Sequence, residues 1–278
     1  RFSSAQRWAR KMIRDITIGQ YYPADSVLHR LDPRTKLAGT LIFIVSVFLF
    51  HTLPGYAVAT VFLAAVIKIS KVPVKFIFKG LKAIFLILLI TMIFNMLLTP
   101  GEELWSLGFI DITREGVSMA VRMAIRLIYL VVGSSLMTLT TTPNQLTDGL
   151  EKSLRPLNRI HVPVHEIAMM MSIALRFIPI LLEETDKIMK AQIARGADFE
   201  SGNLIQKVKN MVPLLVPLFI SAFRRANDLA MAMEARCYHG GSHRTQMKPL
   251  QYKSRDRVAY LVLLLYLAAA VAFRVAGI

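Results

Sequence analysis

The chain has 278 residues, of which 54% are hydrophobic, and it carries 34 Lys and Arg against 18 Asp and Glu. A soluble core needs less apolar residue than this, and a disordered chain would contain far less. The net charge of +16 would also suit a nucleic-acid-binding protein. Here, however, the basic groups flank long apolar stretches, which indicates a protein of the lipid bilayer with no nucleic-acid partner.

The charge pattern predicts the membrane spans. Residues 37–67 and 83–98 contain no Asp, Glu, Lys or Arg. The first stretch is too long for one helix and is interrupted at Leu53-Pro54-Gly55, so a helical hairpin is expected there. Basic segments stay on the cytoplasmic side, which places the N-terminus and the 68–82 and 141–257 segments inside and the acidic 99–116 loop outside. The predicted spans are about 37–51, 55–69, 81–98, 117–140 and 258–275.

These spans define the predicted organisation of an all-α integral membrane protein. Residues 1–11 are expected to be a leftover of cloning, with Met12 as the natural start. An N-terminal membrane domain with four spans covers 12–140, and a cytoplasmic domain of long amphipathic helices covers 141–257. The last membrane helix lies in 258–278.

Capping signals divide the 141–257 region into three helices. Thr142-Pro143-Asn144-Gln145 has the pattern of a capping box with Pro at the first helical position, and the helix should end near Leu154. The second helix should run from about Pro163 to Arg195, where Gly196 provides a stop. The third should start after Asn203, with Gln206 completing a second box, and end near Arg236.

The sequence predicts no catalytic or metal chemistry. It contains no G-x-x-x-x-G-K-[ST] phosphate-binding loop, so no ATP site of its own is expected, and no cofactor. His239 and His243, with Cys237 beside them, could be drawn as a metal site, as could the pair His161 and His165. Zinc needs at least three fixed ligands, and flexible-loop histidines are the better interpretation.

The most informative feature is a repeated helix end. Ala194-Arg195-Gly196 closes the second predicted helix, and Ala235-Arg236-Cys237 closes the third. Arg near a helix C-terminus can simply stabilise the helix dipole, by about 0.3–1 kcal/mol. Two such ends between small neighbours, each after a Met-rich run, also suit docking of the guanidinium into an acidic pocket of a partner.

Two further arginines lie inside the fourth predicted span, one helical turn apart. Ionisable residues within membrane spans are functional candidates. Arg122 is close enough to the outer end to extend its side chain to the interface. Arg126 is deeper, and it is expected to face protein or water.

Several motifs resemble one family. The run His29-Arg30-Leu31-Asp32-Pro33-Arg34-Thr35-Lys36 and the two arginine-containing helix ends are similar to motifs of the transmembrane T component of energy-coupling factor transporters. Cys237 departs from the pattern, because it stands where a second glycine would be. Other matching segments are Ile18–Pro23, Ser26–Leu28, Arg176–Pro179 and Glu234–Tyr238.

The resemblance implies a non-enzymatic scaffold in the bacterial cell membrane. Such a component joins two cytoplasmic ABC-type ATPases to a separate membrane protein, the S component, which binds a vitamin or other micronutrient. The helices within 143–236 would be coupling helices, and Arg195 and Arg236 would each enter a groove on one ATPase.

Two other functions remain open from the residues alone. A conventional transporter would have polar groups along its spans, and the first three predicted spans lack charged residues in their cores. A membrane-embedded enzyme would need paired carboxylates, and the only candidates spread over more than one helix face, which is typical of a solvated surface. These candidates are Glu183, Glu184 and Asp186.

Overall fold

The computed structural model describes residues 21–50, 53–107, 110–199, 203–240, 247 and 249–275. The predicted cloning leftover at 1–11, the predicted start at Met12 and the first residues of the Ile18–Pro23 segment lie outside these ranges. The described chain divides into two compact units. The first unit contains residues up to Gly149 and those from Leu250 onward, and the second contains Leu150–Pro249.

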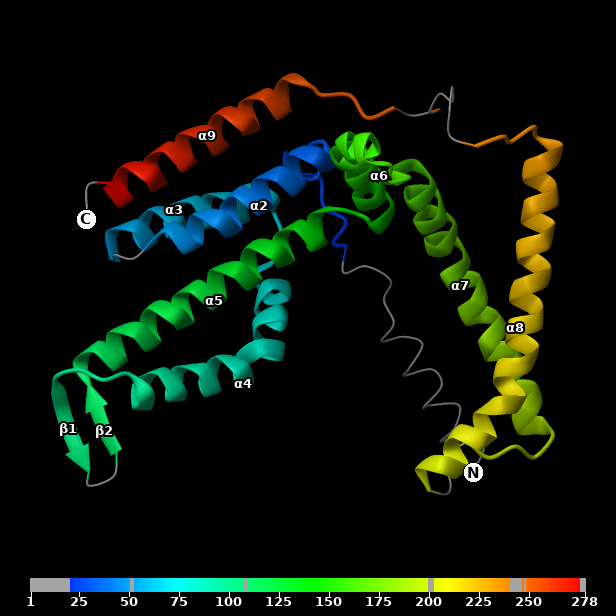
Figure 1. Ribbon diagram of the computed structural model, residues 1–278, viewed down its shortest axis with the longest axis horizontal. Helices are drawn as coiled ribbons and strands as arrows, with labels where there is room; N and C mark the ends of the chain where they lie inside the picture. The colour runs from blue at the N-terminus through cyan, green and yellow to red at the C-terminus, as the bar shows by residue number, and fades with distance from the viewer. Residues whose placement is uncertain are drawn as a thin grey trace. The chain divides into compact units, whose positions relative to one another are not determined.

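Helices make up nearly all of the first unit, as the sequence predicts. They are α2 (Pro33–Leu49), α3 (Leu53–Ser70), α4 (Val74–Leu98), α5 (Arg114–Thr140), the start of α6 (Pro143–Leu154) and α9 (Ser254–Val275). Figure 1 shows α2, α3 and α9 side by side, and α2 also packs along α5. The predicted helical hairpin is confirmed, but its break lies before Leu53-Pro54-Gly55: α2 ends at Leu49, and these three residues begin α3.

The sequence did not suggest the antiparallel hairpin that the structure shows between α4 and α5. Strands β1 (Glu103–Leu107) and β2 (Ile110–Thr113) pair within the 99–116 loop, with Leu107 opposite Ile110. Thr113 then caps α5 by accepting a 3.1 Å hydrogen bond from the Gly116 amide on its side-chain oxygen. The hairpin is short, and the all-α class of the fold is confirmed.

The core of the first unit is formed where α2, α3, α5 and α9 meet. Gly133 on α5 allows Phe43 of α2 to approach, since a Cβ on this glycine would lie 2.7 Å from the Phe43 ring. The Tyr266 ring of α9 stacks on Phe62 with centroids 4.2 Å apart, and its hydroxyl lies 2.7 Å from the Ser46 Oγ. Buried members of this core include Val47, Phe50, Tyr56, Ala59, Leu63, Val132, Leu136, Leu139 and Ala270.

Candidate membrane spans are fewer than the five predicted. Among the described helices α5, α7 and α9 are long and apolar enough to cross a bilayer, and α4 is a fourth if its two arms, bent by 58° after Lys82, count as one span. Helices α2 and α3 have 17 and 18 residues, so each is about 26 Å long, somewhat less than a ~30 Å hydrocarbon core. The cytoplasmic position expected for α7 stays a prediction.

The second unit is built on two long paired helices, α7 (Val164–Ala194) and α8 (Leu204–Ala235), preceded by the 3-10 turn η1 (Arg155–Ile160). They run in opposite directions (Figure 1). A salt bridge of 3.1 Å joins Arg225 to Glu184, and Gln192 Nε2 donates a 3.2 Å hydrogen bond to the Pro213 carbonyl oxygen. The predicted bounds of both helices are confirmed to within a residue or two.

Of the two capping boxes predicted from the sequence, only the first is present. The Thr142 Oγ1 accepts from the Gln145 amide at 3.3 Å, and the Gln145 Oε1 accepts from the Thr142 amide at 3.2 Å. This reciprocal pair is the predicted capping box. Asn203 is the N-cap of α8, but its exposed side chain makes no capping hydrogen bond, so the second predicted box is wrong.

Candidate functional site

Both arginine-containing helix ends have the same backbone geometry. At the end of α7, the Gly196 amide donates to the Ile193 carbonyl at 3.0 Å, and the Ala197 amide donates to the Gln192 carbonyl at 3.0 Å. This pair of hydrogen bonds is the Schellman motif, in which the chain turns through a left-handed residue. Gly196 supplies that residue, with a φ of +87°.

The end of α8 repeats this geometry. The Cys237 amide donates to the Glu234 carbonyl at 2.8 Å, and the Tyr238 amide donates to the Met233 carbonyl at 3.0 Å. Cys237 has a φ of 56°, so it takes the left-handed position that Gly196 takes in the first motif. The departure at Cys237 from the glycine of the family pattern therefore leaves the fold of the turn unchanged.

Each motif places its arginine as the C-cap. Arg195 has φ −85° and ψ 4°, and Arg236 has φ −95° and ψ 15°. Both side chains are exposed, and the described residues give neither of them a salt-bridge partner. The small neighbours are exposed as well, so they leave both guanidinium groups accessible. These neighbours are Ala194, Gly196, Ala235 and Cys237.

The two arginines lie far apart on the helix pair. Arg236 and Arg176 line one hollow, which places the end of α8 beside the first half of α7. Arg195 follows Arg176 by 19 residues on α7, a distance of about 28 Å along the helix axis. One small ligand or one side chain cannot contact both helix ends, so they are two separate sites.

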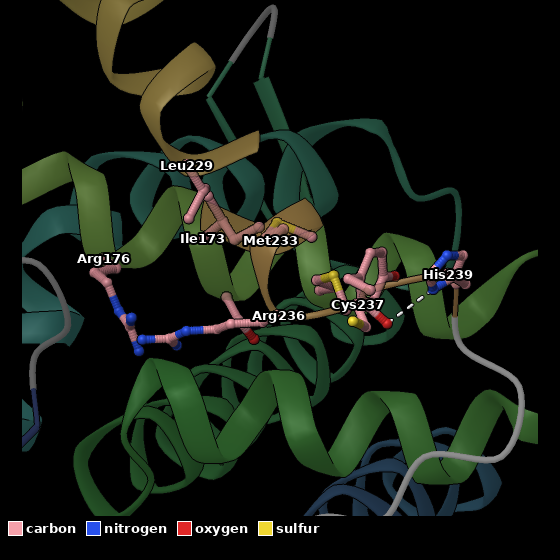
Figure 2. A pocket seen from close by; sticks show the side chains of 11 residues that line it. Ile173, Arg176, Leu229, Met233, Arg236, Cys237 and His239 are labelled. Carbon is pink, nitrogen blue, oxygen red and sulfur yellow. Dashed lines mark hydrogen bonds between the residues drawn. The ribbon is translucent and has the colours of Figure 1, made fainter. Parts of the chain in front are cut away.

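The hollow at the Arg236 end has a volume of about 610 Å³. Figure 2 shows the side chains of Arg176 and Arg236 extending toward one another across it. Its apolar wall comes from Ile173, Leu229 and Met233. His239 Nδ1 donates a 2.9 Å hydrogen bond to the Cys237 carbonyl and so holds the segment that follows the turn.

Helix α8 presents an exposed apolar stripe. Steps of three or four residues keep the stripe on one face of the helix. Phe219 and Phe223 within it are 62% and 67% exposed, whereas Ala222 and Leu229 face α7. This part of the helix surface is thus not covered by α7. The members of the stripe are Ile205, Val208, Val212, Leu215, Val216, Phe219, Ile220 and Phe223.

Arg126 faces protein, which is one of the two environments expected for it. One terminal nitrogen lies 3.3 Å from both the Phe50 carbonyl and the Tyr56 hydroxyl, and the guanidinium carbon is 5.3 Å from the centre of the Phe48 ring. Phe50 is the C-cap of α2, so Arg126 also neutralises the negative end of that helix. Arg122 is half-buried and lines a hollow of about 360 Å³ with Arg126.

Sequence reasoning did not foresee the buried polar network around Asp256. Its carboxylate accepts from the Asp32 amide at 2.8 Å, from the Thr35 hydroxyl at 3.3 Å and from the Lys253 amide at 2.8 Å. Asp32 in turn caps α2 by accepting from the Arg34 amide at 2.9 Å. The network fastens the start of α9 to the start of α2.

Lys36 extends the same network to α5. Its Nζ donates to the Thr140 carbonyl at 2.8 Å and to the His29 carbonyl at 3.2 Å. Arg34 donates to the Leu250 carbonyl at 3.1 Å and lies 4.2 Å from the centre of the Tyr252 ring. These contacts give the His29–Lys36 run, which matched the family pattern, a structural role.

The histidines considered as metal ligands are not gathered into a site. Over the described ranges no group of three or more His, Cys, Asp or Glu side chains comes together. His165 Nδ1 lies 2.9 Å from Glu151, while His243 lies outside the described residues.

The chain matches a known protein family. Residues 24–247 match the family model CbiQ, described as a cobalt transport protein. Such a match defines a membrane-bound transport protein, and the apolar helices place the chain in a membrane.

Individual relatives of known name identify the family more narrowly. The chain is 56% identical to the energy-coupling factor transporter transmembrane protein EcfT of Clostridium kluyveri over 266 residues, which cover 95% of this chain and 98% of the relative. It is 47% identical to the protein of the same name from Bacillus subtilis over 94% of this chain and 99% of the relative. The chain therefore belongs to the family of EcfT transmembrane components, and the resemblance found in its sequence is confirmed.

Proposed function

We propose that this chain is the scaffold that couples two cytoplasmic ATPases to a separate micronutrient-binding S component. The observation that carries the proposal is the pair of identical Schellman turns, each with an exposed arginine as its C-cap. A guanidinium on a rigid backbone turn can form a two-pronged contact with a carboxylate without much loss of side-chain freedom. Two such turns about 28 Å apart suit two partner subunits, one at each end.

The exposed stripe on α8 supports a third contact. Apolar side chains as exposed as Phe219 and Phe223 usually mark a surface covered by a partner or by lipid. An S component lying against this stripe would move when the ATPases close and displace the helix ends. The chain itself would hydrolyse no ATP, and its N-terminus would lie in the cytoplasm of a bacterial cell.

The experiment is a transport assay on reconstituted transporter with Arg195→Ala, Arg236→Ala and the double variant, each checked for normal membrane expression. A charge-assisted hydrogen bond is worth about 1.5–3 kcal/mol, or a factor of about 10 to 150 in affinity. We expect each single variant to retain some transport, because the second anchor keeps the complex together, and the double variant to lose it.

The simpler explanation, that these arginines only stabilise helix dipoles, predicts a different pattern. Lys would then replace Arg without loss, and the double variant would still transport. Under the docking proposal Arg→Lys gives a partial loss, since Lys keeps the charge but not the planar fork. A double Ala variant that is normally expressed and still transports would overturn the proposal.

A further inference from the structure

The hollow beside Arg236 contains a second cationic side chain that belongs to α7. Arg176 is exposed, and Figure 2 shows its guanidinium directed toward that of Arg236. The two residues are far apart in sequence and come from antiparallel helices, so the pairing of α7 with α8 is what brings them to one place. Like charges that converge in this way repel each other unless an anion lies between them.

No such anion is provided by the described part of the chain. The salt bridges among those residues engage Arg30, Arg34, His165, Lys190 and Arg225, and none of them engages Arg176 or Arg236. The acidic residues of α7 that do form ion pairs, Glu184 and Asp186, are held by Arg225 and Lys190. Among the described residues, the negative charge that would satisfy this hollow is therefore lacking.

The hollow, with a volume of about 610 Å³, is large enough to admit a side chain of a docked protein. Part of its wall is apolar and is formed by Met169, Ile173, Leu229 and Met233. A short aliphatic stem would contact these residues while its carboxylate reached both guanidinium groups. Planar guanidinium groups bind a carboxylate through two parallel hydrogen bonds, and two of them on one carboxylate satisfy all four of its lone pairs.

We propose that Arg176 and Arg236 form one shared site for a single Asp or Glu side chain of the ATPase that docks at the end of α8. This inference rests on the proposed function, and it adds Arg176 as a second docking residue at that end. The Arg195 end presents its own guanidinium outside this hollow, so the two ATPase contacts are not equivalent.

The test measures the affinity of the purified ATPase pair for the full chain in nanodiscs of phosphatidylcholine, a zwitterionic lipid without net charge. The variants are Arg176→Gln, Arg236→Gln and their double, together with Arg195→Gln and the Arg176/Arg195 double. Arg224→Gln is the matched control, because Arg224 is exposed on α8 and does not line the hollow. Thermal melting in detergent should be unchanged for Arg176→Gln, since this side chain has no partner within the described chain.

We expect Arg176→Gln to weaken ATPase binding about tenfold or more, and Arg224→Gln to leave it within twofold. Residues that hold one carboxylate are coupled, so the Arg176/Arg236 double should fall short of the product of its single effects by threefold or more. The Arg176/Arg195 double should equal the product, because these residues contact different subunits.

Three results would overturn the shared site, and they are distinguishable. If Arg236→Gln weakens binding and Arg176→Gln does not, the scaffold function stands and this inference fails. If none of Arg176→Gln, Arg236→Gln and Arg195→Gln weakens binding, both the shared site and the proposed scaffold function fail. If Arg176→Gln matters only in discs that contain acidic phosphatidylglycerol, the hollow binds a lipid headgroup instead.

Discussion

The side-chain nitrogen of Lys36 donates a 2.8 Å hydrogen bond to the backbone carbonyl of Thr140, joining the start of α2 to the end of α5. Lys36 is only 6% exposed, although it is charged in water and lies just before the apolar stretch that begins at Leu37. A buried ammonium must be matched by acceptors, and here the Thr140 and His29 carbonyls serve. The residue is therefore a structural joint of the first unit.

Replacing Lys36 by Met should destabilise the protein. Met fills a similar volume but leaves both carbonyls without a donor, at a cost of about 2–4 kcal/mol. We expect the melting temperature of the purified chain in detergent to fall on the order of 5–10 °C. Lys75→Met is the control, because Lys75 is exposed and should change the temperature little. Equal shifts for the two variants would contradict this role.

The same residue predicts a pH dependence. Burial lowers the pKa of Lys36 from 10.5 to about 8, although Asp256 and Asp32 nearby act against the shift. Between these two values the unfolded chain binds more protons than the folded chain, so the contribution of Lys36 to stability rises with pH. The parent protein should therefore gain melting temperature relative to Lys36→Met between pH 7 and pH 9.5. A difference that stays constant would show that the pKa is not lowered.

Equivalent positions in the two turns should respond in opposite directions. Cys237→Gly removes a side chain from a left-handed conformation and should stabilise the chain by about 1 kcal/mol. Gly196→Ala adds one at φ +87° and should destabilise it by about 1–2 kcal/mol. Apart from the adjacent residues, the described chain has no atom within 4 Å of the added Cβ at position 196, so the loss would be conformational and not a clash. Melting in detergent measures both.

Arg126 should matter more for stability than its neighbour Arg122. Arg126→Leu deprives the Phe50 carbonyl and the Tyr56 hydroxyl of a donor, and Tyr56 is only 2% exposed. The expected loss is about 1–3 kcal/mol, read as a lower melting temperature in lipid nanodiscs. Arg122→Leu is the control, since the described residues give Arg122 no hydrogen-bond partner. A larger effect at Arg122 would contradict the assignment.

The sequence predicted what is local. Thr142 and Gln145 are three residues apart, so their capping box follows from a short pattern, as do the helix stops at Gly196 and Cys237. Contacts between distant segments were not predictable in this way. The Asp256 carboxylate accepts a hydrogen bond from the Asp32 amide, which lies 224 residues earlier in the chain. The sequence near Asp256 does not indicate that partner.

The same distinction between local patterns and long-range contacts applies to the candidate site. Arg195 and Arg236 could be found from the sequence because their neighbours repeat. Arg176 could not be linked to Arg236, since only the antiparallel pairing of α7 and α8 brings them to one hollow. The β1–β2 hairpin was missed because four or five residues per strand carry too little alternation to stand out from a loop.

The antiparallel helix pair also resists changes in its length. An α-helix bends and tilts far more readily than it stretches, because lengthening it breaks every backbone hydrogen bond along its axis. Partners attached at Arg195 and Arg236, as proposed, would therefore be held at a nearly fixed separation. If the partners approach each other, the helix pair must rotate or bend. Bending is easiest at Pro179, Pro213 and Pro217, where a backbone hydrogen bond is already absent. Motion at the two ends would then appear as a change in direction of the Phe219 and Phe223 face.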